Sequence, residues 1–216
     1  MRTFFKWTIA AAAAGLLASC STAPQRVVQA PPPMIPRELP YRWTQGNAPQ
    51  AHQDALVAFG PVALRPGEFR WVAAIPEEGE TKGVIDLLTQ RFYVYRGDKL
   101  AGMATISSGE KGRETQLGFW KVRLKKKLGY SRKYDNAPMP FMQMYDEKGI
   151  AFHAGKNPGY PASHGCVRLP LKFAERLYGL TKVGTEVIVE GCPAGTAGTC
   201  GGSSARRMRP AEIDDD

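Results

Sequence analysis

The side chains best suited to covalent chemistry are concentrated between residues 153 and 168. Cys166 lies there with two of the chain's three histidines, His153 and His164. A cysteine becomes a strong nucleophile as its thiolate, which a nearby imidazole or a helix N-terminus favours. The sequence predicts both, because two histidines are close to Cys166 and a helical pattern begins just after it. We therefore predict acyl chemistry at Cys166, with the N–H groups of Gly165 and Cys166 directed at a developing oxyanion.

Two other interpretations of the same residues stay open. A single cysteine or histidine is often a packed core residue, so the cluster could be structural. His153, His164 and Cys166 could also bind zinc, although the fold-forming region offers no second cysteine for a closed four-ligand site. We predict no metal and no cofactor. His52 belongs to no motif, and we expect it to be solvated or packed.

Short strands separated by turns must position these residues. Apolar runs rich in β-branched and aromatic residues predict strands at 84–88, 91–95, 100–107, 119–124, 142–145, 150–153 and 186–189. Helical spacing of apolar residues is clear only from Leu169 to Leu180. These patterns predict a mostly β domain with one main helix over residues 82–190. Two apolar runs at 55–59 and 69–72 fit either short strands or helical turns.

The first twenty residues have the pattern of an export signal. Arg2 and Lys6 precede an apolar run, 7–17, that is too short for the roughly 20 residues of a membrane span. The ending at Cys20 resembles the lipobox of bacterial lipoproteins, which implies acylation of Cys20 and, with Ser21 following, attachment to the outer membrane. An ordinary signal peptide is the alternative. We predict a signal at 1–19 and then, at 20–81, a proline-rich tether and N-terminal extension.

Two further cysteines flank a loop of small residues near the other end of the chain. Cys192 and Cys200 are separated by seven residues, 193–199, that could bring the two sulfurs together. We predict a disulfide in an oxidising compartment, where loop closure would contribute about 2–3 kcal/mol. Two free thiols are the alternative. The segment 191–216 is predicted to be a flexible tail around this loop.

A set of motifs between residues 82 and 190 resembles the L,D-transpeptidases, the YkuD-type cysteine enzymes that cross-link peptidoglycan. The central match is the run Ser163-His164-Gly165-Cys166-Val167-Arg168, with His153-Ala154-Gly155 before it. Further similarities are the strand pair at 84–95, the Ser-Ser-Gly turn at 107–109, the Pro-Met-Pro-Phe segment at 138–141 and the closing strand at 184–187. The family's common Thr-Pro-x-Gly is replaced by Thr115-Gln116-Leu117-Gly118, which puts the local turn in doubt.

The resemblance implies a role for each residue of the motif. Cys166 would be the nucleophile, and His153 would act as the proton acceptor and donor. His164 and Gly165 would shape the oxyanion hole, and Ser163 would support His153 by hydrogen bonding. Arg168 would orient the loop or bind a carboxylate through its guanidinium group. The implied fold is a β-sandwich or partly closed barrel with the site at one end.

The resemblance and the charge of the chain also imply its partners. The expected donor is a peptidoglycan tetrapeptide stem, and carbapenem-type β-lactams are expected to inhibit. A net charge of +9 includes a basic run between residues 121 and 133, which we interpret either as a solvated hairpin or as a surface for stem-peptide carboxylates or an anionic envelope polymer. Nucleic acid is not an expected partner of an exported protein. The acceptor could be a second stem, an envelope protein or water.

Overall fold

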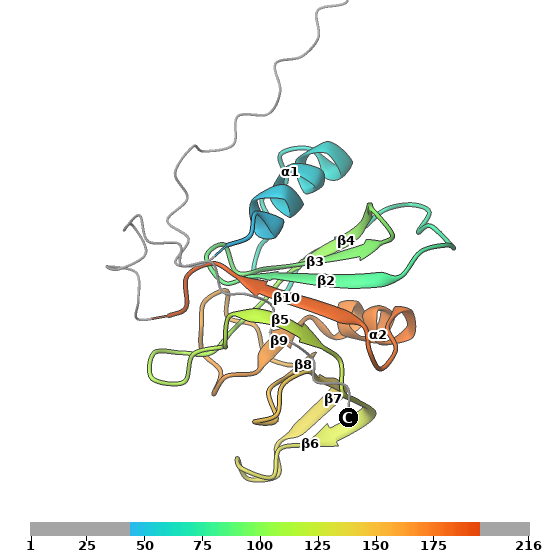
Figure 1. Cartoon of the computed structure of the whole chain (residues 1–216). Helices are drawn as coiled ribbons and strands as arrows, with labels where there is room; N and C mark the ends of the chain where they lie inside the picture. Colours follow the sequence, from blue (N-terminus) through green and yellow to red (C-terminus); the bar gives the residue numbers. More distant parts are fainter. Residues whose placement is uncertain (1–43, 195–216) are drawn as a thin grey trace, which may run out of the picture. The chain divides into compact units, whose positions relative to one another are not determined.

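The computed structural model describes residues 44–194 (Figure 1). The export signal, Cys20, Cys200 and most of the predicted tail lie outside these residues. The described elements, in chain order, are α1 (Asn47–Phe59), β1 (Phe69–Trp71), β2 (Thr81–Asp86), β3 (Arg91–Arg96), β4 (Lys99–Thr105), β5 (Gly118–Lys121), β6 (Leu124–Tyr130), β7 (Pro138–Met144), β8 (Ala151–Ala154), β9 (Val167–Leu169), α2 (Leu171–Leu180) and β10 (Glu186–Glu190).

Two sheets form the scaffold, which confirms the prediction of a mostly β fold with one main helix. The larger sheet has the order β1-β4-β3-β2-β10-β5, and only its β2–β10 pair is parallel. The smaller sheet has the order β6-β7-β8-β9, in which β8 and β9 are parallel. The sheets form no closed barrel, so strand edges remain at both ends of each sheet.

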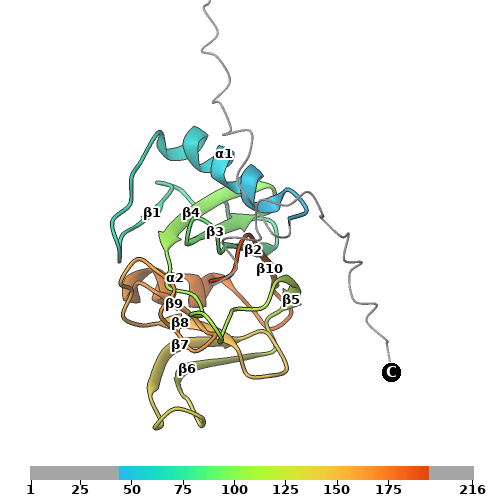
Figure 2. The same ribbon diagram turned by 90° about the vertical axis from the view of Figure 1, so that its left-hand side faces the viewer.

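Alternating side chains of the larger sheet enter two different cores. On one face, Val84, Tyr93 and Ile188 pack against Ala48 and other small residues of α1. The opposite face contributes the larger core, which it shares with the smaller sheet and α2 (residues Ile85, Phe92, Val187, Phe152, Val167 and Phe173 among others). Because side chains alternate along a strand, the central strands are buried on both faces. In Figures 1 and 2, α1 and the β6–β7 hairpin accordingly lie at opposite ends of the described domain.

The segment whose structure the sequence left open contributes to this scaffold. Residues 47–59 form the helix α1, and Phe69–Trp71 forms the strand β1, which pairs antiparallel with β4. The carboxylate of Glu190, at the end of β10, accepts hydrogen bonds from the backbone N–H groups of Gln45 and Ala48, both at 2.8 Å. The start of α1 is thereby bonded to the last strand of the larger sheet.

Two predicted elements had wrong boundaries, each for a local reason. The predicted strand 119–124 is divided, since β5 ends at Lys121 and β6 begins at Leu124. The basic run therefore contributes the edge strand β6. The predicted helix 169–180 begins only at Leu171, because Leu169 ends the strand β9 and Pro170 lies between them. No helix within residues 44–194 is long and apolar enough to cross a membrane.

Candidate active site

Cys166 and His153 lie on one face of the smaller sheet. The parallel pair β8–β9 aligns His153 with Arg168 and Phe152 with Val167. Residues two apart on a strand share a face, so Cys166, one residue before β9, lies on the same side as Arg168 and His153. The neighbours Phe152 and Val167 point the other way into the main core. The pairing of two strands thus brings together a thiol and an imidazole thirteen positions apart in the sequence.

The hydrogen bond of His153 determines which ring nitrogen is available. The Nδ1 atom is 2.8 Å from the carbonyl oxygen of Ala154, and a carbonyl can only accept, so Nδ1 carries the proton. Nε2 is then the unprotonated nitrogen. Burial lowers the pKa of His153, and the nearby charge of Arg168 lowers it further, against the opposing effect of the Ala154 bond. Neutral His153 is therefore a proton acceptor.

Cys166 is held as a thiol by its surroundings. It packs against Met139, Met142 and Ala151 in a small apolar cluster. Burial raises the pKa of Cys166, and the effects of a backbone hydrogen bond at Ala151 and of the Arg168 charge oppose this rise. The helix N-terminus that we expected beside Cys166 is not there, because β9 separates the cysteine from α2. Activation of the thiol accordingly depends on proton removal.

Ser163 holds the backbone before Cys166. Its hydroxyl donates to the carbonyl oxygen of Cys166 and accepts from the N–H of Gly165 at 3.1 Å. Ser163 therefore supports the loop, whereas we expected it to hydrogen bond to His153. The same contact engages the Gly165 N–H that we expected to face the oxyanion. Thr115, to which the sequence analysis gave no role in the site, donates from Oγ1 to the carbonyl oxygen of Gly165 at 2.8 Å.

Gly165 has the backbone conformation and the space that only glycine tolerates. Its φ is +116°, and a Cβ atom built there would approach Cδ1 of Ile150 to 2.8 Å. The site loop depends on this glycine for its shape. Gly109 has a similar role on the Thr115 side, since its added Cβ would lie 2.1 Å from the carbonyl oxygen of Arg113.

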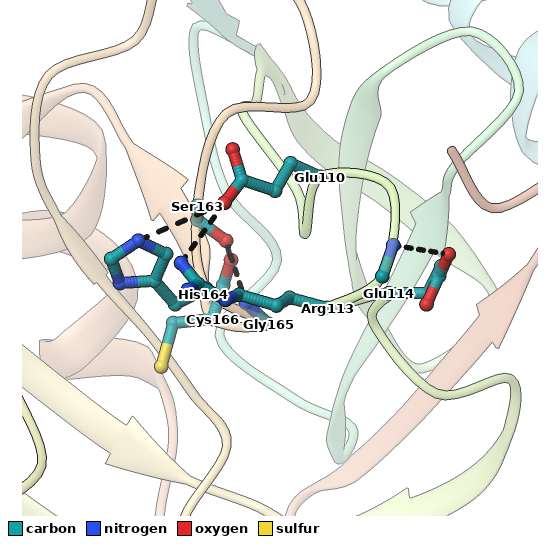
Figure 3. Close-up of polar contacts among 8 residues, drawn as sticks. Glu110, Arg113, Glu114, Ser163, His164, Gly165 and Cys166 are labelled. Atoms are coloured by element: carbon teal, nitrogen blue, oxygen red, sulfur yellow. Dashed lines mark hydrogen bonds and ion pairs between the residues drawn. The ribbon is translucent and has the colours of Figure 1, made fainter. Parts of the chain in front are cut away.

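His164 points toward a charged cluster beside the loop (Figure 3). Its Nε2 lies 3.7 Å from Oε1 of Glu110, which also pairs with Arg113 at 3.1 Å. The ring of Tyr134, from the β6–β7 turn, lies against the His164 ring with centroids 4.2 Å apart. In Figure 3 the Cys166 sulfur points away from the Glu110 carboxylate. His164 thus connects the loop to Glu110 and Tyr134. None of these contacts shows the expected contribution to the oxyanion hole.

The three proposed zinc ligands do not converge. Within residues 44–194, no group of three or more His, Cys, Asp or Glu side chains is arranged to bind a metal ion. His164 faces Glu110, while Cys166 packs among methionines. This geometry does not fit the zinc interpretation of the motif.

Arg168 projects from β9 into the site with its charge unneutralised. Its aliphatic portion covers Gly155, where an added Cβ would lie 3.2 Å from Cγ of Arg168. No carboxylate in the described part of the chain forms an ion pair with its guanidinium group. Arg168 is therefore available to bind a carboxylate of a ligand.

A cleft of about 1260 Å³ extends from Cys166 across the face of the smaller sheet. His153, Cys166 and Arg168 lie in it, together with residues of the β6–β7 hairpin at the lower end of the domain in Figure 2. Its floor includes Met139, Met142 and Met144, which the sequence analysis had not connected with the site. Methionine is common in buried strands, so only the pairing of β7 with β8 reveals that these residues border the thiol.

Cys192 follows β10 and is disulfide-bonded. Its predicted partner, Cys200, lies outside the described residues, so their pairing stays a prediction. Cys166 is a free cysteine. The Cys166 thiol therefore does not take part in the disulfide.

Comparison with known protein families identifies the domain that carries this site. The L,D-transpeptidase catalytic domain, YkuD, matches residues 80–189, a little over half of the 216 residues. The chain belongs to the L,D-transpeptidase family. The match includes His153, Ser163 and the residues that follow it through Arg168. No protein with a curated description matches the sequence.

Several solved L,D-transpeptidase structures are similar to this chain. One from Stackebrandtia nassauensis is 23% identical, with 65% of this chain and 66% of that chain covered and a TM-score of 0.48. One from Mycobacterium smegmatis is 21% identical, with coverages of 51% and 58% and a TM-score of 0.47. L,D-transpeptidase 3 from Mycobacterium tuberculosis, solved with a faropenem-derived adduct, is 19% identical, with coverages of 50% and 59% and a TM-score of 0.46. The chain thus spans less than two thirds of the length of these proteins.

Proposed function

We propose that the protein forms a thioester between Cys166 and a peptidoglycan tetrapeptide stem and transfers the acyl group to an acceptor amine. The observation that carries this proposal is the placement of Cys166 and neutral His153 on one face of the β8–β9 pair, in an open cleft. A structural cysteine would gain nothing from a proton acceptor on the same face. Membership in the L,D-transpeptidase family supports the stem peptide as donor.

The first half of the reaction forms the thioester. His153 accepts the Cys166 proton at Nε2 as the sulfur attacks the carbonyl carbon that follows an L-residue of the stem. The tetrahedral intermediate then collapses, the bond to the terminal D-residue breaks, and His153 returns the proton to the departing amine. Because the Gly165 N–H is bonded to Ser163, we assign the Cys166 N–H to the oxyanion.

Arg168 is proposed to position the stem. Its guanidinium group borders the cleft without an internal carboxylate partner, so a substrate carboxylate can form the paired hydrogen bonds that such a group favours. This contact would place the scissile carbonyl group near Cys166. Loss of Arg168 is expected to raise KM more than it lowers the rate of the chemical step.

Two alternatives share parts of this proposal. If water resolves the thioester, the same residues produce an L,D-carboxypeptidase or hydrolase. If no thioester forms, the domain is a peptidoglycan-binding lipoprotein without catalysis. The cleft is open, so a large acceptor can enter it; a hydrolase would need a site that admits only water.

The deciding experiment compares the wild type with Cys166→Ser and His153→Gln on tetrapeptide-bearing peptidoglycan, with products identified by mass. The wild type is expected to release the terminal D-residue and to form a new amide with an acceptor. His153→Gln should slow thioester formation by about 10²- to 10⁴-fold, the usual contribution of a general base. A Cys166→Ser protein with full activity would overturn the proposal, and release without any new amide would favour the hydrolase.

Covalent inhibition provides a second test of the nucleophile. A carbapenem should acylate Cys166, because its strained amide carbonyl presents the same electrophile to the thiolate. Intact-mass analysis should show one adduct on the wild type and none on Cys166→Ser. Absence of an adduct on the wild type would contradict the proposed role of Cys166.

We also propose that the protein is a lipoprotein, acylated at Cys20 and held on the periplasmic side of the cell envelope, at the outer membrane. The support is the sequence pattern at residues 1–21. The wild type should fractionate with membranes, and Cys20→Ala should become extractable without detergent. Continued membrane fractionation of Cys20→Ala would exclude this anchor.

A further inference from the structure

The cleft is bordered by cations that have no internal counter-charge. They come from β6, β9 and three loops: Lys126, Arg132, Lys133, Lys148, Lys156 and Arg168. The cleft lining has fewer acidic residues, Glu114 and Asp135. None of the six forms an ion pair with a residue in the described range 44–194. Arg123, by contrast, belongs to the same basic run, lies outside the cleft and pairs with Glu147. Unpaired cations in one cleft produce a positive potential that favours an anionic ligand.

Three of these cations follow the edge strand β6 from end to end. Lys148 lies in the loop after β7, beside the start of β6, where Arg123 pairs with Glu147. Lys126 is within β6, and Arg132 lies in the turn that follows it. Seven residues of strand span about 20 Å, so the charges are spread too widely for one carboxylate. The spacing fits an extended ligand with several negative charges.

Apolar side chains lie between these cations. Leu128 and Tyr130 are each 49% exposed although both border the cleft, and Leu124 is 37% exposed. Across the β6–β7 pairing, Leu124 is aligned with Met144 and Lys126 with Met142. A simple polyanion would leave this surface in water, whereas a polypeptide with both acidic and apolar side chains would cover it.

We propose that the acceptor amine is presented by an acidic polypeptide segment that lies along β6 in the cleft. The name β6 strip is used below for its binding surface, which comprises Leu124, Lys126, Leu128, Tyr130 and Arg132. This proposal rests on the proposed acyl transfer and specifies its acceptor. The cleft volume of about 1260 Å³ exceeds the roughly 300–1,000 Å³ of most small-ligand sites, which leaves room for a second chain beside the stem.

The transfer step consumes the thioester. The acceptor nitrogen attacks the thioester carbonyl carbon, a C–N bond forms, and the C–S bond breaks. The nitrogen loses one proton to His153, which passes it to the departing Cys166 sulfur. The products are an amide and the free thiol, so no further reactant is required.

The test measures a ratio of two acceptors within the same reaction. Full-length protein, acylated by a tetrapeptide donor, receives equal amounts of two peptides of about eight residues with a free N-terminal amine. One carries glutamate and leucine side chains, and its twin has glutamine at every glutamate. The wild type should prefer the acidic peptide by about tenfold, and salt near 1 M, where screening acts within about 3 Å, should remove the preference.

Reversal of charges on the β6 strip tests whether the acidic peptide binds there. In Lys126→Glu/Arg132→Glu, the ratio of the two products should fall to one or below. The matched control is Lys121→Glu/Lys127→Glu, which reverses the same number of charges at two exposed lysines that do not border the cleft. The control should keep the wild-type ratio. A ratio that falls equally in both variants would show a general charge effect and overturn the assignment to the β6 strip.

Two further outcomes separate this inference from the proposed function. If the wild type forms the thioester but does not distinguish the twin peptides, the acceptor inference fails and the acyltransferase stands. If no thioester forms, the proposed function fails. A third peptide, with serine at each leucine, tests the apolar part of the β6 strip. If its product yield equals that of the acidic peptide, and polygalacturonate inhibits transfer to both peptides equally, the occupant is an anionic envelope polymer. That result would overturn the polypeptide.

Discussion

His153 and Arg168 occupy paired positions on the parallel strands β8 and β9. The backbone between these strands therefore fixes the separation of an imidazole and a permanent positive charge. That charge opposes protonation of His153, and burial of the ring acts in the same direction. The same two strands hold Cys166 on this face, so the proposed base, the proposed nucleophile and the proposed substrate-binding cation share one rigid support.

We predict that Arg168→Gln moves the acidic limb of the activity profile to higher pH. The lowered pKa of His153 keeps the ring neutral as the pH falls, and activity is lost when the ring gains a proton. Removal of the Arg168 charge raises that pKa, so protonation begins at a higher pH. The measurement is the second-order rate constant of carbapenem acylation against pH, with Lys127→Gln as the charge-matched control. An unchanged acidic limb in Arg168→Gln would show that Arg168 does not act on His153.

We predict slow alkylation of Cys166 in the absence of substrate. Because burial raises the pKa of Cys166, less thiolate exists at neutral pH than in an exposed cysteine. Iodoacetamide should react more slowly with the native protein than with the unfolded chain. The rate for the native protein should keep rising at pH values where a free cysteine is already fully ionised. Alkylation as fast as in the unfolded chain near pH 7 would instead indicate a preformed thiolate.

Most of the strands and the family motif around Cys166 could be predicted from the sequence because both depend on local patterns. Runs such as 91–95 have the β-branched and aromatic residues typical of strands, and the order of residues 163–168 is specific. The β6 strand was missed because lysines interrupt its apolar residues. Leu169 was assigned to the helix because its spacing from Phe173 is helical, although Pro170 separates strand from helix.

Side-chain directions in the site loop could not be predicted in this way. Ser163 and His164 are adjacent, yet one bonds the loop backbone and the other faces Glu110. Their directions follow from the loop conformation, including the positive φ of Gly165, and not from any periodicity. Thr115 acts over a separation of 50 residues, so no local pattern could connect it with Gly165.

We predict that Ser163→Ala impairs catalysis more than folding. The substitution removes the hydroxyl that joins the Gly165 N–H to the Cys166 carbonyl group. Loss of these contacts in a buried loop should lower the free energy of unfolding by about 1–3 kcal/mol and misalign Cys166. Acylation rate and urea unfolding should be measured on the same preparation. Ser107→Ala is the control, because Ser107 is also buried and bonded to a loop carbonyl, that of Tyr160. Equal loss of acylation in both variants would contradict a specific role for Ser163.

We predict that Glu190→Gln loosens α1 from the larger sheet. The Glu190 side chain is fully buried, and its carboxylate also accepts from Thr44 Oγ1 at 2.7 Å and Asn47 Nδ2 at 2.9 Å. An amide would turn an NH₂ group toward these donors, and the negative charge at the start of α1 would be lost. The free energy of unfolding should fall by about 2–3 kcal/mol, which is typical when a buried charged acceptor is removed.

The measurement for Glu190→Gln combines urea unfolding with hydrogen exchange of the α1 amides. Glu186→Gln is the matched control, since Glu186 is on the same strand, β10, but exposed. Exchange should increase first in residues 45–55, whereas amides of β8 and β9 should exchange as in the wild type. If both variants unfold at the wild-type urea concentration, the hydrogen bonds at Glu190 do not secure α1. If β8 and β9 open together with α1, the helix and the catalytic sheet form one cooperative unit, and the predicted local effect is wrong.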